Sequence, residues 1–441
     1  MRRGLWVLLF VAGCYRPSPA PGQPCSPSGD CPQGQSCVNG TCVVGDGGGL
    51  DACPVACEND QLTDCTGSHV CPFGCGTSAP PHCAALVPSN GITVDLLDGA
   101  TADLTGLELD FDTDDGEIVD ENGDTVRDPG EGIIAGIGFT SRDGMGVFTA
   151  HSFALPLETA WSADGDNALV LFAAESIVID GLFDAGASGL FGGPGGANGV
   201  NGGATPNSCT GGDGRFKVTL TASAGGGGGG GATKGGAGAM TAADVNGATA
   251  GGAGGTACSP PSTTPLLGGN GGGAAGAEGG VVMGGPGGGA GGAVALVAMT
   301  RVQISGTVAA PGAGGGTNSG ANGGGGGGGG GAVFLESPSV TLFGALTANG
   351  GGGGPPGNTS TVRVSGQRGH IADAAPATGG AFNNVRGGNG GAGTTAPTDG
   401  ATLTGGAGGG GAAGAIHIRS RNSEITGLTS PSATSDQATL E

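Results

Sequence analysis

The carboxylates whose spacing comes closest to that of a recognisable site lie in one acidic stretch. Asp110, Asp112, Asp114 and Glu121 occupy the first, third, fifth and twelfth positions of a single window. Hard oxygen ligands at these positions suit Ca²⁺. The sixth position, where the sharp turn of such a loop requires glycine, is Asp115. A calcium site and a solvated acidic hairpin loop are therefore the two alternatives, and calcium is the one cofactor that the sequence suggests.

The cysteines form a second set of residues with recognisable chemistry. Ten of the 13 lie between Cys25 and Cys83, a density typical of exported modules that are stabilised by disulfides. Zinc is the alternative for clustered cysteines, but zinc sites favour Cys-X-X-Cys pairs in reducing compartments, and these spacings are longer. Disulfides, with the pairing left open, are expected for Cys25, Cys31, Cys37, Cys42, Cys53, Cys57, Cys65, Cys71, Cys75, Cys83, Cys209 and Cys258.

The first residues of the chain predict export. Residues 1–13 combine two arginines, a short apolar run and small residues, which is the pattern of a secretory signal. The run Val11-Ala12-Gly13-Cys14 resembles the lipobox of bacterial lipoproteins, and this resemblance implies cleavage before Cys14 and acylation of its thiol and its new amino group. Several acyl chains on one residue give stable anchoring. The absence of Asp after the cysteine favours the outer membrane, and an ordinary signal peptide is the alternative.

Composition limits the other partners. The chain of 441 residues carries a formal net charge of -22, whereas nucleic acids are bound through basic patches. Nucleic acid is therefore not an expected partner. Glycine accounts for 108 residues, without the strict three-residue period of collagen. The hydrophobic fraction of 37% argues against disorder of the whole chain.

Repeated apolar segments are the elements that must position these groups. Side chains two residues apart are apolar in each of them, which is the period of a strand and not of a helix. One such segment cannot bury its apolar face alone, so stacking against its neighbours must supply the core. The expected fold is all-β, with parallel β-helix or β-solenoid repeats. The segments are Ala168–Ala185, Ala293–Ala310, Ala332–Ala348 and, more weakly, Ala415–Gly427.

Glycine should serve two purposes around these strands. Gly306 and Gly344 follow the second strand of their segments and mark bends where a side chain would obstruct the chain. The long runs, such as Gly323–Gly331, could remain flexible loops or could form polyproline-II-like helices that hydrogen-bond laterally to one another. Ordered packing of this polyglycine-II-like kind is favoured, because the runs recur at fixed places in the repeat.

The sequence divides into consecutive regions by these signals. Alternating apolar residues at Ile92, Val94 and Leu96 predict a further strand before the repeats. His151 and His417 lie on strand-like segments without acids close by in the sequence, and both are expected to be structural or exposed. The regions are a signal peptide (1–13), a Pro-rich tether (14–24), a Cys-rich disulfide stalk (25–84), a β domain with the acidic loop (86–166), a Gly-rich β-repeat domain (167–430) and a flexible tail (431–441).

Two stretches carry a resemblance to known proteins. The segment from Cys25 to Cys42 is similar to the short EGF-like stalk repeats of bacterial surface lipoproteins. The segments ALVLFAAESIVIDGLFDAG, GGAVALVAMTRVQISGTVAAPG and GGAVFLESPSVTLFGALTANGGGGG resemble those of Gly-rich, PE-PGRS-like bacterial surface proteins, although the PE domain itself has no counterpart here. The resemblance implies a surface-displayed β-solenoid and carries over no catalytic residue.

The function predicted from these observations is that of a non-enzymatic cell-surface lipoprotein, a structural or adhesive scaffold of the envelope. Its expected partners are the membrane, through the lipid anchor, and envelope or extracellular polysaccharide or protein. A β-helix carbohydrate-active enzyme is one alternative, but such enzymes place carboxylates with Lys or Arg along one strand face. Here Glu175, Asp184 and Glu336 are isolated in the sequence. A calcium-dependent binding module is the other alternative.

Overall fold

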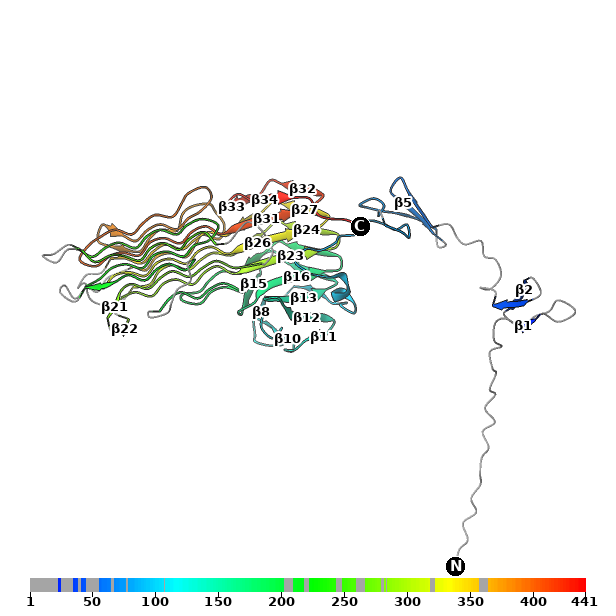
Figure 1. Ribbon diagram of the computed structural model, residues 1–441, viewed down its shortest axis with the longest axis horizontal. Coiled ribbons are helices and arrows are strands. Elements are labelled where there is room, and N and C mark those ends of the chain that lie inside the picture. Colours follow the sequence, from blue (N-terminus) through cyan, green and yellow to red (C-terminus); the bar gives the residue numbers. More distant parts are fainter. Residues whose placement is uncertain are drawn as a thin grey trace, which may run out of the picture. The chain divides into compact units, whose positions relative to one another are not determined.

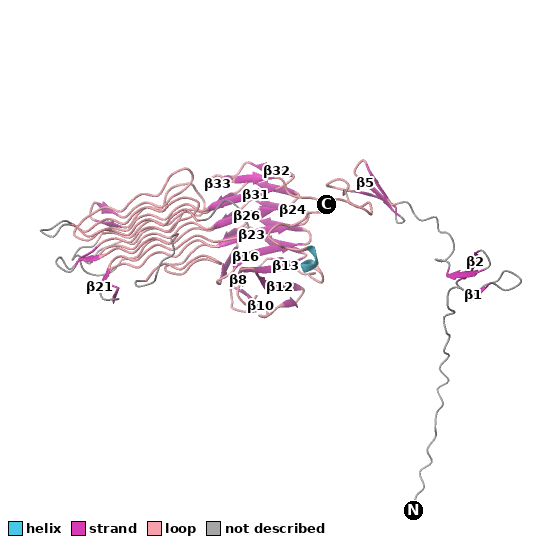
Figure 2. Cartoon of the chain, in the orientation of Figure 1, coloured by secondary structure: helices cyan, strands magenta, loops and turns pink. Residues whose placement is uncertain are grey.

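The chain forms two compact units, Met1–Ala84 and Ala85–Glu441, and the second is called the head below. It is seen here in a computed structural model (Figures 1 and 2). The structure describes residues 23–24, 35–38, 41–44, 55–64, 67–76, 78–106, 108–201, 209–217, 222–242, 248–258, 266–278, 281–282, 284–317, 322–356 and 364–441. Each unit is described by itself.

The first unit is held together by short antiparallel strands and disulfides. Bonds join Cys57 to Cys75 and Cys71 to Cys83. Cys71 and Ala84 are the buried apolar residues among those whose burial is described in this unit, so the bridges take the place of a core. The strands are β1 (Gln23–Pro24), β2 (Gln35–Val38), β3 (Thr41–Val44), β4 (Ala56–Glu58), β5 (Gln61–Asp64) and β6 (Gly67–Val70).

Three large sheets organise the head, and the class is all-β. Sheet A holds, in spatial order, β10 (Thr125–Arg127), β9 (Ile118–Asp120), β8 (Leu109–Asp112), β15 (Ala160–Asp164), β18 (Leu182–Asp184), β25 (Thr307–Ala309), β28 (Ala345–Thr347) and β33 (Leu428–Ser430). Sheet B holds β11 (Gly132–Ile134), β12 (Ile137–Arg142), β13 (Met145–Ala150), β16 (Ala168–Ala173), β23 (Ala293–Ala298), β26 (Ala332–Glu336), β31 (Ala415–Arg419) and β34 (Thr434–Asp436).

Sheet C completes the set, and small hairpins occur in the glycine-rich segments between the repeats. It holds β32 (Asn422–Ile425), β27 (Ser339–Leu342), β24 (Arg301–Ile304), β17 (Ser176–Ile179), β14 (Ser152–Leu155) and β7 (Asp103–Thr105). The small hairpins are β19 (Phe216–Lys217) with β20 (Ala222–Ser223), β21 (Ala277–Glu278) with β22 (Val281–Val282), and β29 (Ala381–Phe382) with β30 (Val385–Arg386).

Each repeated segment contributes one strand to each of the three sheets, in the order B, C, A. Neighbouring copies pair in parallel and in register, so that Leu171 pairs with Leu296 and Leu296 with Leu335. The pairing follows the alignment expected from the apolar pattern. Residues 86–166, which were expected as a separate β domain, lie in the same three sheets, where β13, β14 and β15 pair with β16, β17 and β18.

The side chains that point inward from the three sheets form one buried cluster, which we call the apolar column. Leu171, Leu296 and Leu335 are each fully buried in it. At one end the aliphatic side chains give way to aromatic ones, and Trp161 contacts Phe111 and Phe183 with ring centroids 5.6 and 6.0 Å apart. The inward side chains of the three sheets thus share a common core.

Sheet B is buried on its other face as well, by the two ends of the head. Leu86, Ile92 and Ala438 pack against the outward side chains of β13, β16 and β23. Backbone hydrogen bonds join Ala85 and Glu441 in both directions, at 2.7 and 3.0 Å. This explains why β16 and β23 are apolar at every position rather than alternating.

Two expectations fail at these ends. The residues Ile92, Val94 and Leu96 do not form a strand, because Val94–Leu97 is a short 3₁₀ helix (η1) whose leucines cover sheet B. The tail 431–441 is not flexible, because β34 pairs with β31 and the last residues pair with Ala85–Val87. In both places, contacts with sheet B outweigh the structure that the local sequence pattern predicts.

The described residues between 186 and 292, 311 and 331, and 349 and 414 form a second region, which we call the glycine lattice. Its runs extend from the sheets and lie side by side (Figures 1 and 2). Along Gly323–Gly331 the direction of the backbone hydrogen bonds repeats every three residues. Gly324 donates to Gly406 and Gly327 donates to Gly409, while the residues between them donate to other runs.

The run Gly323–Gly331 therefore has neighbours on all sides. It donates to the runs 406–412, 310–316 and 270–273, and it accepts from the runs 285–291, 226–229 and 351–354. No side chain fits between runs at this distance. A Cβ added to Gly328 would lie 1.8 Å from the oxygen of Gly289. Ordering so much glycine is costly, and these bonds offset that cost because nearly every backbone donor of the run finds an acceptor.

Candidate ligand pocket

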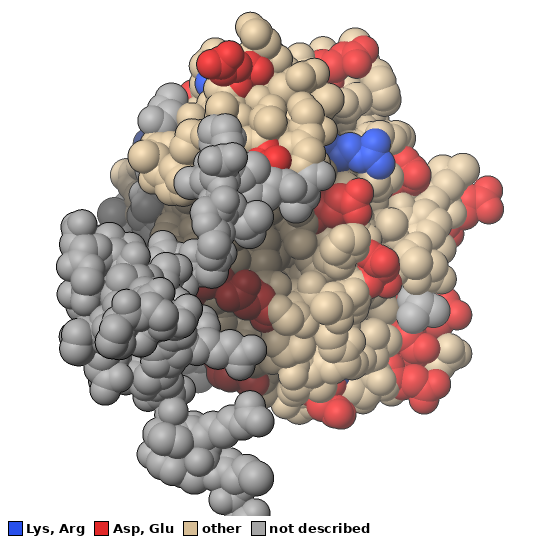
Figure 3. All heavy atoms as spheres, turned by 90° about the vertical axis from the view of Figure 1, so that its right-hand side faces the viewer, with Lys and Arg blue, Asp and Glu red and all other residues tan. Residues whose placement is uncertain are grey.

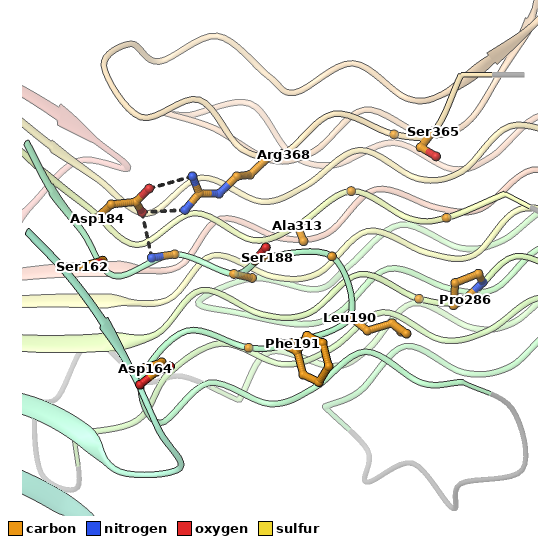
Figure 4. Close-up of a pocket in the computed structure, with 18 of the residues that line it drawn as sticks. Ser162, Asp164, Asp184, Ser188, Leu190, Phe191, Pro286, Ala313, Ser365 and Arg368 are labelled. Carbon is orange, nitrogen blue, oxygen red and sulfur yellow. Dashed lines mark hydrogen bonds and ion pairs between the residues drawn. The ribbon is translucent and has the colours of Figure 1, made fainter. Parts of the chain in front are cut away.

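A hollow of the head lies where sheet A meets the glycine lattice. It has a volume of about 980 Å³ and is bordered by strands β8, β15 and β18 and by several lattice runs. Figure 4 shows its labelled side chains, which come from segments far apart in the sequence. Charged, hydroxyl and aromatic side chains border this one space, and we take it as the candidate functional site.

A row of polar side chains lines the strand side of this pocket. Asp110, Ser162 and Asp184 are paired across three adjacent strands of sheet A. Their neighbours Leu109, Trp161 and Phe183 point into the apolar column, so strand alternation turns the polar residues outward. The hydroxyl of Ser162 donates to Oδ1 of Asp110 at 2.9 Å. The pattern that builds the column thereby also aligns these groups on the outer face.

Asp184 is joined to the lattice by an ion pair with Arg368. The guanidinium Nη1 and Nη2 atoms lie 2.8 and 2.5 Å from the two carboxylate oxygens (Figure 4). The backbone N–H of Gly186 donates to the same carboxylate at 2.9 Å. The side chains of Asp184 and Arg368 are 24% and 36% exposed, so the pair is fixed but still borders the pocket. Sequence reasoning missed it, because 184 residues separate the partners.

Asp164 lies further along the same face of β15 and also borders the pocket. Partial burial raises the pKa of Asp164, and the nearby carboxylates of Asp110 and Asp112 raise it further. The pocket thus brings together three carboxylates, of Asp110, Asp164 and Asp184, against the one guanidinium of Arg368. Its field favours uncharged or cationic ligands and disfavours anions.

One turn presents an aromatic ring at the opposite border of the pocket. Ser188 and Phe191 exchange backbone hydrogen bonds of 3.1 and 3.0 Å, and Gly189 between them has a φ of +60°, which favours glycine. Lattice residues Gly199 and Gly289 donate to this turn and fix it. The Phe191 side chain is nevertheless 72% exposed. Nothing in the sequence distinguished this phenylalanine from those of the core.

The residues predicted to bind calcium include Asp110, Asp112 and Asp114 on and beside β8, and one carboxylate oxygen of each of these three accepts hydrogen bonds. Asp112 Oδ1 accepts the backbone N–H of Asp114 at 2.8 Å, and Asp114 Oδ1 accepts that of Asp166 at 2.9 Å. Glu121 lies in the exposed turn between β9 and β10. Within the described ranges, no three His, Cys, Asp or Glu side chains are grouped so that they could hold a metal ion. Calcium binding at Asp110 and its neighbours stays a prediction.

The cysteines expected to be oxidised fall into three groups. Disulfides join Cys57 to Cys75, Cys71 to Cys83 and, within the lattice, Cys209 to Cys258. Cys37 and Cys42 are register partners in the antiparallel pair β2–β3. Cys25, Cys31, Cys53 and Cys65 lie outside the described residues, as does Cys14, which was expected to be acylated.

The charges that are isolated in the sequence are paired in the head. Glu336 is fully buried, where its carboxylate accepts hydrogen bonds from Ser89 at 2.7 and 2.9 Å and pairs with Arg419 at 3.1 Å. Burial raises the pKa of Glu336, and the bonds from Ser89 and Arg419 oppose that rise. The expectation that these charged side chains would be isolated was wrong, because stacking of the repeats brings strands that are distant in the sequence together.

His151 also has acidic neighbours, against expectation. Its Nδ1 lies 2.8 Å from Oδ1 of Asp103 and its Nε2 lies 3.6 Å from Glu175. Asp103 also accepts the hydroxyl of Ser152, at 2.6 Å. The hydrogen bond with Asp103 raises the pKa of His151, and the hydrogen bonds from Ser152 and His151 lower the pKa of Asp103. Since Ser152 and His151 both bond to the acid and not to each other, this is not the order of a nucleophile and its base.

Comparison with family models, with curated proteins and with solved structures gave no match. No helix within the described part of the chain is long and apolar enough to cross a membrane.

Proposed function

We propose that this chain is a non-enzymatic lipoprotein of the cell surface whose head is a structural and adhesive scaffold of the envelope. One observation carries the proposal, the joining of a side-chain-packed column to a backbone-bonded lattice in a single compact unit. Close-packed interiors have low compressibility, and a fully hydrogen-bonded network is rigid. Such a head suits a protein that holds its shape outside the cell.

The finer architecture that we propose is a parallel β-helix, or β-solenoid, combined with polyglycine-II-like packing. The order B, C, A of successive strands and their parallel register support the first part. The three-residue repeat of hydrogen-bond direction along Gly323–Gly331 supports the second, since polyproline-II-type helices have three residues per turn. Short disulfide modules precede this head, as Cys57–Cys75 and Cys71–Cys83 illustrate.

The partners of this proposal are the outer membrane, through acylated Cys14, and envelope or extracellular polysaccharide or protein. Nucleic acid is left out because the net charge is -22. On the face of the molecule seen in Figure 3, acidic side chains are frequent and basic ones are few. Cys14 itself lies outside the described residues.

Protease treatment of intact cells tests the display. We expect the chain to be digested before lysis, and the Cys14→Ala variant to leave the membrane fraction. A chain that is protected until lysis, or a Cys14→Ala variant that remains membrane-bound, would contradict the proposal.

A carbohydrate-active enzyme of β-helix type is the second candidate. The observation that favours it is the common face of Asp110, Asp164 and Asp184 beside Arg368, because enzymes that cleave glycosidic bonds work with paired carboxylic acids. Turnover assays on a panel of polysaccharides decide between the two. Cleavage that is lost in Asp164→Asn would replace the non-enzymatic proposal.

A further inference from the structure

We infer that the pocket between sheet A and the glycine lattice binds a short saccharide segment without acidic groups, with Phe191 as its stacking platform. The inference rests on the proposed scaffold function, because it names the ligand class through which the head would adhere. It is carried by three features of the pocket, which are its exposed ring, its polar groups and its excess of negative charge.

The exposed ring is the first feature. Phe191 is 72% exposed although the turn Ser188–Phe191 is fixed by its own two hydrogen bonds and by the lattice. The turn can pack closely on the lattice because Gly289, which lies against the carbonyl of Phe191, has no side chain. A large apolar surface that is left in water loses the favourable burial energy of the ring. A rigidly presented ring without a covering side chain suits the flat apolar face of a sugar.

The polar groups are the second feature. The carboxylates of Asp110 and Asp164 accept hydrogen bonds only, and the Arg368 guanidinium, held by Asp184 at 2.5 and 2.8 Å, is a donor. Sugar hydroxyls both donate and accept, so they can satisfy both kinds of group at once. The pocket volume of about 980 Å³ lies within the range of ligand sites, and Figure 4 shows Phe191 and the Asp184–Arg368 pair on different segments that border it.

Charge is the third feature, and it selects among saccharides. Three carboxylates border the pocket against one guanidinium, and that guanidinium is already paired with Asp184. Uronic acids and other anionic sugars would therefore meet a repulsive field. Neutral sugars carry no such penalty, and amino sugars would gain from it. The ligand class is accordingly a neutral or amino-bearing glycan.

Calorimetric titration of the purified full chain with three polymers tests the inference. The probes are dextran as a neutral glycan, chitosan oligosaccharide as an amino glycan and polygalacturonate as an acidic one. We expect binding of dextran or chitosan oligosaccharide or both, and no binding of polygalacturonate. Phe191→Ala should weaken the binding at least about tenfold, and Asp164→Asn should weaken the chitosan arm most.

Phe343→Ala is the matched control, because Phe343 is also an exposed phenylalanine, at 52%, but lies on the turn between β27 and β28. It should bind as the unaltered chain does. Both phenylalanines are exposed, so circular dichroism should show both variants folded. The inference is overturned if no polymer binds, if polygalacturonate binds best, or if Phe191→Ala binds as tightly as Phe343→Ala. Failure of the proposed surface display would appear separately, in the protease experiment on intact cells.

Discussion

The apolar column and the glycine lattice occupy one compact unit but are stabilised in different ways. In the column, inward side chains such as Leu171 and Leu296 pack in a common apolar core, while the backbones of their strands pair within the sheet. In the lattice, the runs around Gly323–Gly331 meet backbone to backbone, and side chains are excluded. The column loses stability when atoms are removed from it, whereas the lattice loses stability when atoms are added.

The apolar residues of the column and the glycines of the lattice therefore have separate roles. Burial of apolar area is non-directional, so strand register in the column depends on the match of side chains between copies. Hydrogen bonds are directional, so the three-residue repeat of the lattice aligns each run with several neighbours at once. The pocket lies at the junction, where outward residues of the strands face carbonyls and amides of the runs.

The largest expected effect comes from removing atoms from the column. Leu296→Ala deletes a fully buried side chain that stacks between Leu171 and Leu335. We expect the free energy of unfolding to fall by about 2–5 kcal/mol, because lost burial and a cavity add together. Denaturant unfolding of the full chain measures this change. An unaltered midpoint would show that the column is not the main core.

Adding one methyl group to the lattice should have the next largest effect. Gly328→Ala places a Cβ 1.8 Å from the oxygen of Gly289, so a run must move, and overpacking of this kind costs about 1–3 kcal/mol. Gly144→Ala is the control, because its Cβ meets nothing within 4 Å and only the φ of +75° is strained. The control should lose about 1 kcal/mol. Equal losses in the two variants would show that the runs are loosely packed.

The smallest expected effect is a pH dependence of stability, which arises from side chains at the strands and not from the lattice. The pKa of His151 is raised by Asp103, so the stability from this pair is full below the unfolded pKa of about 6.5 and is lost as pH rises through the folded value. The pKa of Asp103 is lowered, so its share is lost only as pH falls through that folded value. His151→Gln should therefore lower the melting temperature at about pH 5.5 more than at about pH 8.5. Because the side chains are exposed, the shift is small, and the opposite sign would contradict the assignment.

The strand scaffold could be predicted from the sequence because its signal is local. The alternation of Val302 and Ile304 gave the strand, and its recurrence as Val340 and Leu342 gave the register that the structure has. The glycine bend was predictable for the same reason. A Cβ on Gly344 would lie 1.8 Å from the oxygen of Gly306, so successive corners stack too closely for any side chain.

The lattice neighbours and the pocket could not be predicted in this way. A run of identical glycines carries no pattern that distinguishes one partner run from another, so the contacts of Gly323–Gly331 have no sequence signature. The Asp184–Arg368 pair joins residues that are 184 positions apart in the sequence. Phe191 looks like any core phenylalanine until the turn that exposes it is known. The sequence order also separates Glu336 from Ser89, which contact each other in the head.

The double hydrogen bond between Ala85 and Glu441 has a practical consequence for work on this molecule. Both ends of the head lie side by side at the sheets, and the glycine runs extend the other way in Figure 1. A fluorescent reporter or purification handle fused after Glu441 would sit next to the entry of the chain into the head. The described glycine runs would then stay unobstructed for labelling, imaging or attachment to a surface.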